Sequence, residues 1–284
     1  MRTASPLGGL RTSLIGHCGE AQELLQRALD DVDFDESWPS GQAKMSDDEL
    51  RRFVLCAYGL SVRKAGVHMA AVRLANEQNN VASLGVHARV LIECAAELVA
   101  VAHAYVDGTP KALDRILNLT EFDTNRLLRR ITRGEISREE LEAGITRARE
   151  AIGLFDGRQP KGTTITDRVS ILTQGKGWYD YLSRHFCDSD VESLGKSPGQ
   201  GGVVPAPELQ FDLAVAVILN GTLTYVCQML IAYGAIRIKS GSGSQLFDDA
   251  VALFDRVRET AAPIRSGPSE VARLVRAAGE ASGG

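Results

Sequence analysis

The sequence is poor in cysteine, and its five cysteines lie far apart, at Cys18, Cys56, Cys94, Cys187 and Cys227. No two of them form a CxxC pair and the count is odd, which argues against a disulfide framework and a structural zinc site. Four of the five lie in apolar, helix-like stretches, as is typical of buried free thiols in a reducing compartment. The first residues also lack the long apolar run of a secretory signal, so we expect a cytoplasmic protein.

The sequence also lacks the alternation of apolar and polar residues that marks β-strands, and it has no excess of positive charge. Apolar and polar residues almost never alternate with a period of two, so half-buried β-strands are not expected. The net charge is −4, and an acidic chain binds nucleic acid only through a local basic patch. RNA is therefore an open but unfavoured partner.

The local signals that the sequence does contain are mostly those that start or stop a helix. Ser46-Asp47-Asp48-Glu49 is a capping box that opens a helix to about Gln78. An apolar helix over about 81–106 ends at Asp107-Gly108, and a second one over about 207–239 begins at Pro207. The sequence thus predicts an all-α, multi-helix bundle around two long apolar helices.

We predict one core with two peripheral segments. Residues 1–45 are expected to form an N-terminal helical arm, residues 46–239 the bundle core, and residues 240–284 the C-terminal helices and a flexible tail. The stretch 213–236 carries no charge and is long enough to cross a bilayer. Polar residues cluster at its middle, among them Asn220 and Gln228, so we favour a buried core helix over a membrane span.

The first apolar helix carries three charges that such a helix does not need. Arg89, Glu93 and Glu97 follow one another at intervals of four, so they share one stripe. Arg89 and Glu93 can pair and are expected to be partly buried, whereas Glu93 and Glu97 repel each other without a cation or proton. The stripe is either a structural ion pair or part of a ligand pocket. A metal site is not expected, because no Glu is followed by His three residues later.

Two stretches resemble an uncharacterised family of bacterial all-helical proteins. The string HARVLIECAAELV is similar to a family helix in which Arg is followed by Glu four residues later, here Arg89 and Glu93. A second family helix reads roughly Tyr-x-x-Leu-Ser-x-x-x-His, and WYDYLSRHFCDSD supplies Leu182 and Ser183 with Cys187 at the family's His position. The resemblance adds Ser183 and Cys187 to the candidate binding residues and implies no activity.

The chain is also broadly similar to the HEPN superfamily of helical bundles, some of which are metal-independent RNases in defence and toxin systems. Their Arg-x(4–6)-His pattern is matched by Arg63 and His68, and by Arg11 and His17. Such spacings are common by chance in an Arg-rich chain. The resemblance makes Arg63 and His68 weak catalytic candidates.

Four arginines share one face of a predicted helix, because they fall at i, i+3, i+4 and i+7: Arg126, Arg129, Arg130 and Arg133. Such a face can hold phosphates or an acidic partner. The acids nearby favour local salt bridges, and no aromatic residue interleaves the face.

The functional hypothesis is a helical-bundle binding or interaction protein, whose partner is an unknown protein or small ligand and which needs no cofactor. A homodimer is an open alternative. The competing hypothesis is a HEPN-like RNase of a phage-defence or toxin system.

Overall fold

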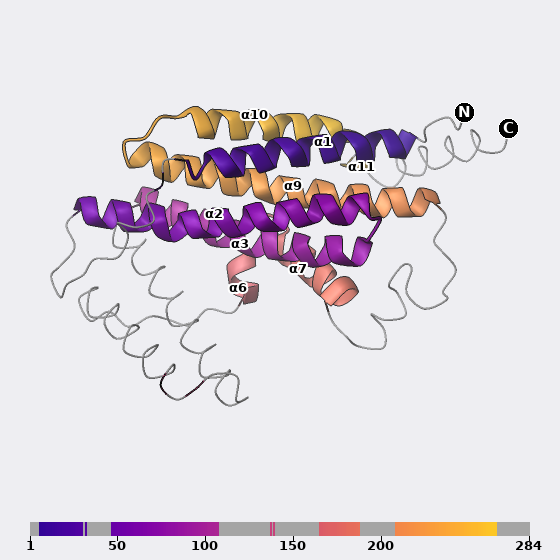
Figure 1. Cartoon of the computed structure of the whole chain (residues 1–284), viewed down its shortest axis with the longest axis horizontal. Coiled ribbons are helices and arrows are strands. Elements are labelled where there is room, and N and C mark those ends of the chain that lie inside the picture. The colour runs from indigo at the N-terminus through magenta and orange to yellow at the C-terminus, as the bar shows by residue number, and fades with distance from the viewer. Residues whose placement is uncertain are drawn as a thin grey trace.

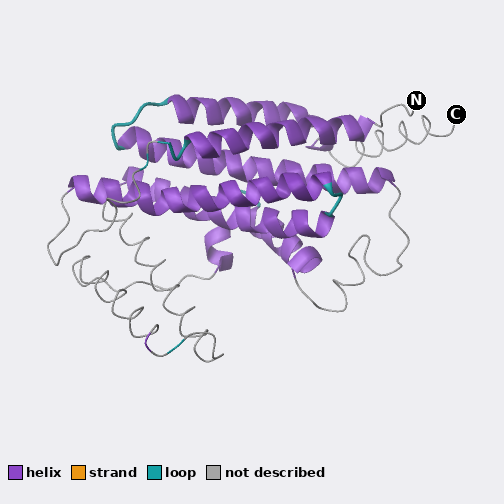
Figure 2. Ribbon diagram, in the orientation of Figure 1, coloured by secondary structure: helices purple, strands orange, loops and turns teal. Residues whose placement is uncertain are grey.

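The computed structural model describes residues 6–30, 32, 47–107, 137, 139, 165–187 and 208–265. Within these ranges all regular structure is helical and no strand occurs (Figure 2). The predicted fold class is therefore confirmed: the protein is an all-α bundle. The helices in chain order are α1 Pro6–Arg27, α2 Asp47–Glu77, α3 Val81–Asp107, α6 Ile165–Val169, α7 Gly175–Leu182, the π-helical turn η1 Ser183–Cys187, α9 Glu208–Lys239, α10 Gln245–Thr260 and α11 Ala262–Arg265.

The long helices run side by side along the long axis of the molecule, and α9 lies at their centre (Figure 1). It packs against α1 and α10 on one side and against α3 and α2 on the other. The short helices α6 and α7 lie against α3, on the side away from α1 and α10 (Figure 1). Because α9 contacts α1, α2, α3 and α10, most of its circumference faces apolar neighbours, and its sequence is correspondingly apolar.

Among the described helices, α9 is the one that is long and apolar enough to cross a membrane. Of its most apolar window, 67% is buried inside the bundle. Thr222, one of the polar residues at its middle, is buried and donates a hydrogen bond from Oγ1 to the carbonyl oxygen of Ile218 at 2.8 Å. These are the properties of a central core helix.

The helices α1 and α10 pack on α9 as parts of the same bundle. Fully buried side chains of α1, such as Leu14 and Leu25, and of α10, such as Leu253, join one continuous core with α9. The division into an arm over 1–45, a core over 46–239 and a C-terminal segment over 240–284 stays a prediction. The described parts of α1 and α10 contribute buried side chains to the core around α9.

The helices α9 and α10 approach each other closely at one glycine. A Cβ atom at Gly234 would lie 2.9 Å from Cα of Phe247, so only glycine fits between the two backbones. The connection between the helices spans 240–244, where Gly241 has a φ of 90°.

Candidate functional site

A cluster on α3, α7 and η1 brings together most of the residues predicted to bind. Nε of Arg89 lies 3.5 Å from Oε1 of Glu93, and both side chains are partly buried, at 29% and 28% exposed. Arg89 also donates a hydrogen bond from Nη2 to the hydroxyl of Tyr179. Its Cζ atom lies 4.7 Å from the centre of the Tyr179 ring, which is a cation–π distance. Arg89 therefore joins α3 to α7.

Cys187 on η1 also interacts with Arg89. Partial burial lowers the pKa of Arg89, but the interactions with Cys187 and Tyr179 outweigh it and leave the pKa above its ordinary value. Arg89 is thus a permanent cation in this cluster. Ser183 lies between Tyr179 and Cys187 in the chain, and its buried Oγ has no hydrogen-bond partner among the described residues.

Glu97 does not belong to this cluster. Nη1 of Arg168 on α6 donates a hydrogen bond to Oε1 of Glu97 at 2.7 Å, and both side chains are almost fully buried. The repulsion expected between Glu93 and Glu97 is offset by this second arginine. The stripe therefore divides into two ion pairs: Arg89–Glu93 lies within α3, and Glu97–Arg168 holds α3 to α6.

Four rings form an aromatic cluster on α7 and η1: Trp178, Tyr181, His185 and Phe186. Tyr181 is at its centre, with its ring centre 5.9 Å from that of Trp178, 4.6 Å from that of His185 and 6.2 Å from that of Phe186. Tyr181 is 40% exposed. The aromatic cluster thus presents one large ring to the surface.

Two glycines position the aromatic cluster on the bundle. A Cβ atom at Gly85 on α3 would lie 2.3 Å from the ring of Phe186, and one at Gly221 on α9 would lie 3.0 Å from the ring of Trp178. Each ring therefore lies in the place of a missing side chain. Phe186 and Cys187 are consecutive, yet both contact α3, because they lie in a π-helical turn. Such turns are rare in proteins overall, and many of those that occur are found at functional sites.

The turn before α7 is also fixed by tertiary contacts. Gln174 adopts a left-handed conformation with a φ of 60°, and a Cβ atom at the next residue, Gly175, would lie 2.2 Å from the carbonyl oxygen of Val169. The hydroxyl of Tyr225 on α9 donates a hydrogen bond to the carbonyl oxygen of Thr173 at 3.1 Å. The segment that carries the aromatic cluster is therefore held at this end by the turn, and at its other end by the contact of Phe186 with Gly85.

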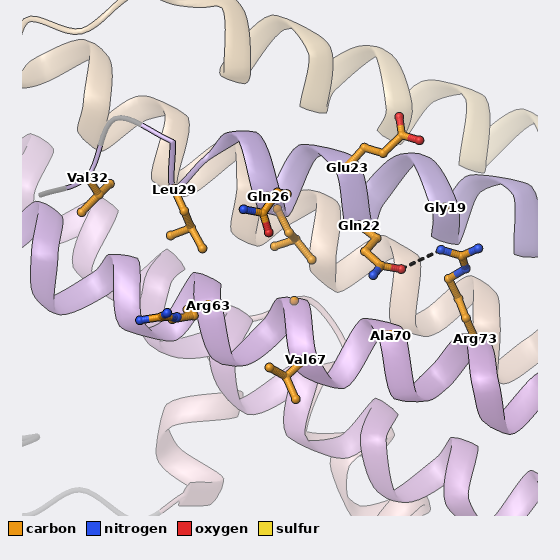
Figure 3. A pocket seen from close by; sticks show the side chains of 12 residues that line it. Gly19, Gln22, Glu23, Gln26, Leu29, Val32, Arg63, Val67, Ala70 and Arg73 are labelled. Atoms are coloured by element: carbon orange, nitrogen blue, oxygen red, sulfur yellow. Dashed lines mark hydrogen bonds between the residues drawn. The ribbon is translucent and has the colours of Figure 1, made fainter. Parts of the chain in front are cut away.

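The structure separates the two RNase candidates. Arg63 lies on the exposed side of α2 and lines a groove of about 730 Å³ between α1 and α2 (Figure 3). His68 faces α3 instead, where its Nδ1 lies 2.9 Å from Nδ1 of His87. The second match is also divided, because Arg11 bonds Asn76 and Asp212 whereas His17 bonds Glu20 and Thr260.

The remaining predictions concern metals and the basic face. Among the described residues, no group of three or more His, Cys, Asp and Glu is placed to hold a metal ion. The basic face of Arg126, Arg129, Arg130 and Arg133 lies outside the residues that the structure describes.

Arg168, Tyr179 and the aromatic cluster are site features that no sequence pattern predicts above. Four of the nine residues from Trp178 to Phe186 are Trp, Tyr or Phe, in a chain with only 6% of these residues, and this density was a usable signal. Arg168 gave no such signal, because it is 71 residues from Glu97.

A comparison of the chain with family models, with curated proteins and with solved structures finds no match.

Proposed function

We propose that the chain is an intracellular helical-bundle interaction protein that binds a protein partner through the aromatic cluster. The observation that carries this proposal is the exposed Tyr181 ring, surrounded by Trp178, His185 and Phe186. Aromatic residues are enriched at protein interfaces and supply most of their binding energy when a partner removes them from water.

The support beneath the aromatic cluster favours a binding role. Arg89 and Tyr179 fasten α7 to α3, and the rings of Phe186 and Trp178 lie on Gly85 and Gly221. A surface that is rigid before binding loses little conformational entropy when the partner arrives. Arg89 and Tyr179 thus support the surface from below, and the rings would make the contacts with the partner.

The charges on the same segment indicate what the partner offers. Lys176 and Arg184 are exposed, and Nζ of Lys176 lies 2.7 Å from Oδ2 of Asp180 at the surface. A partner with an apolar pocket for Tyr181 and charged groups around that pocket would complement both features.

Site-specific photocrosslinking tests the proposal in cells that express the chain. A benzophenone amino acid placed at Tyr181 is expected to give one discrete protein adduct. The same group at Ile171 or Ile238, which are exposed to about the same degree at 39% and 41%, is expected to give none. No adduct at Tyr181, or equal adducts at all three positions, would overturn the proposal.

The RNase hypothesis is the alternative, and it requires Arg63 and His68 to act on one phosphodiester. In one copy of the chain these residues face different neighbours, the α1/α2 groove and His87. Incubation of the purified protein with single-stranded RNA separates the two hypotheses. Cleavage that is lost in both Arg63→Ala and His68→Ala would establish the RNase, and intact RNA would remove it.

A further inference from the structure

The outer face of α2 carries a row of exposed apolar side chains at intervals of seven residues. Leu60 is 49% exposed, Val67 66% and Leu74 53%. Seven residues are close to two helical turns, so the three side chains lie in one line over about 21 Å. We name this line the α2 stripe. Single exposed apolar residues need no explanation, whereas a line of three at heptad spacing is the pattern of a helix-pairing seam.

The α2 stripe borders the groove between α1 and α2, and Val67 belongs to both. Figure 3 shows the groove running along the two helices, with Leu29 and Val32 near Arg63 at one end and Gln22 near Arg73 at the other. Along α2 it extends from Arg63 to Arg73, about 15 Å, which lies within the length of the α2 stripe. An elongated surface of this kind suits a helix better than a compact small molecule.

We propose that the α2 stripe pairs with the same stripe of a second copy of the chain, antiparallel and about a two-fold axis at Val67. The spacing makes the stripe complementary to itself, because Leu60 and Leu74 are each seven residues from Val67. In this pairing Val67 packs on Val67, and Leu60 of each copy packs on Leu74 of the other. Such an isologous contact closes as a dimer.

The residues beside the stripe fit the antiparallel direction. Residue 67−n of one copy faces residue 67+n of the other, so the long side chains of Arg63 and Lys64 face Ala71 and Ala70. Large side chains thus oppose small ones. A parallel pairing would instead set Arg63 against Arg63, and like charges at one place repel.

Charge also favours the antiparallel direction. Glu23 lines the groove near the end where its neighbour Gln22 bonds Arg73, and Arg63 lines the opposite end (Figure 3). Antiparallel pairing brings Arg63 of one copy over the end that carries Glu23 of the other. The two-fold axis repeats this contact, so the dimer gains two complementary charge pairs.

This inference goes beyond the proposed function, since it concerns a different face of the bundle. The α2 stripe and the aromatic cluster lie on different elements, so one copy can use both at once. A dimer would then present two aromatic clusters.

Sedimentation equilibrium of the full chain from about 1 to 200 µM tests the pairing. We expect a dimer, and Val67→Glu should raise its dissociation constant about 100-fold or more, because two carboxylates would meet at the axis. Ile238→Glu, at an exposed apolar position on α9, is the matched control and should leave it unchanged. An unaltered far-ultraviolet circular dichroism spectrum of Val67→Glu shows that the fold is intact, and Leu74→Ser provides a second disruption.

Cysteine crosslinking under mild oxidation tests the direction. Val67→Cys is expected to form a covalent dimer by itself, whereas Leu60→Cys and Leu74→Cys should crosslink only when mixed. Arg63→Glu should weaken the dimer, and Arg63→Glu combined with Glu23→Arg should restore it. A monomer throughout the concentration range, a dimer insensitive to Val67→Glu, or self-crosslinking of Leu60→Cys would overturn the proposal.

Discussion

Arg89 on α3 and Tyr179 on α7 connect the helical bundle to the segment that carries the aromatic cluster. The guanidinium donates a hydrogen bond to the phenol and lies 4.7 Å from the centre of its ring. The two residues are 90 positions apart in the sequence. This contact gives Arg89 a structural role in the largely apolar helix α3.

Replacement of Arg89 by Ala is expected to destabilise the fold by about 1–2 kcal/mol. It removes the hydrogen bond and cation–π contact to Tyr179, while Glu93 remains partly hydrated at 28% exposed. A buried and unpaired Glu93 would cost about 3 kcal/mol or more. Urea unfolding measures the difference, with Arg89→Lys keeping the charge and losing the planar fork. Stability equal to that of the parent protein would show that the contact does not form.

The buried ion pair of Glu97 and Arg168 predicts a different pattern. Removal of one partner, in Arg168→Ala, should cost about 3–5 kcal/mol because it leaves a carboxylate in an apolar environment. The double variant Glu97→Leu/Arg168→Met should lose less than either single variant, since it removes both charges and keeps the volume. Additive losses in chemical unfolding would contradict a coupled, buried pair.

The glycines of the bundle fall into two groups whose Ala variants should move in opposite directions. Gly85→Ala and Gly234→Ala place a methyl group against Phe186 and Phe247, and we expect each to destabilise by about 1–3 kcal/mol. Gly66→Ala is the control, because a Cβ atom there meets nothing within 4 Å. It should stabilise α2 by about 0.5–1 kcal/mol through helix propensity. Similar shifts in melting temperature for all three variants would contradict these packing contacts.

The histidine pair between α2 and α3 predicts sensitivity to acid. Burial lowers the pKa of His68 and of His87 below the ordinary value of 6.5, and for His68 the neighbouring His87 and Lys64 add to the effect. The folded state therefore binds protons less readily than the unfolded state at these sites. The stabilisation they give is present above pH 6.5 and is lost as the pH falls through the lowered values.

The melting temperature at about pH 7.5 and about pH 5.5 measures this effect. We expect His68→Gln to reduce the drop on acidification, because Gln keeps a polar contact and does not titrate. His103→Gln removes an exposed imidazole and should leave the drop as it is in the parent protein. Identical drops in all three proteins would show that the pair has no part in acid sensitivity.

Local sequence signals predicted the helices closely. The capping box at Ser46 indicated a helix that the structure has from Asp47 to Glu77, and the expected apolar helices correspond to Val81–Asp107 and Glu208–Lys239. Such signals succeed because capping and helix-stopping residues act within a turn of their own position. Whether α1 and α10 contribute to the core depends on how the helices are arranged around α9, and no local sequence pattern specifies that arrangement.

The candidate site was only partly predictable for the same reason. The spacing of Arg89 and Glu93 indicated their pairing, because residues four apart on a helix are neighbours. Tyr179 and Arg168 come from other helices, so spacing along α3 could not indicate them. The places of Gly85 and Gly221 under two aromatic rings depend likewise on tertiary packing.

The affinity of the chain for the partner captured at position 181 tests the central proposal most directly. We expect Tyr181→Ala to weaken binding about tenfold or more, as for an aromatic residue at the centre of an interface, with an unchanged melting temperature. Ile171→Ala should bind as the parent protein does. An affinity unaffected by Tyr181→Ala would show that the aromatic cluster is not the binding surface.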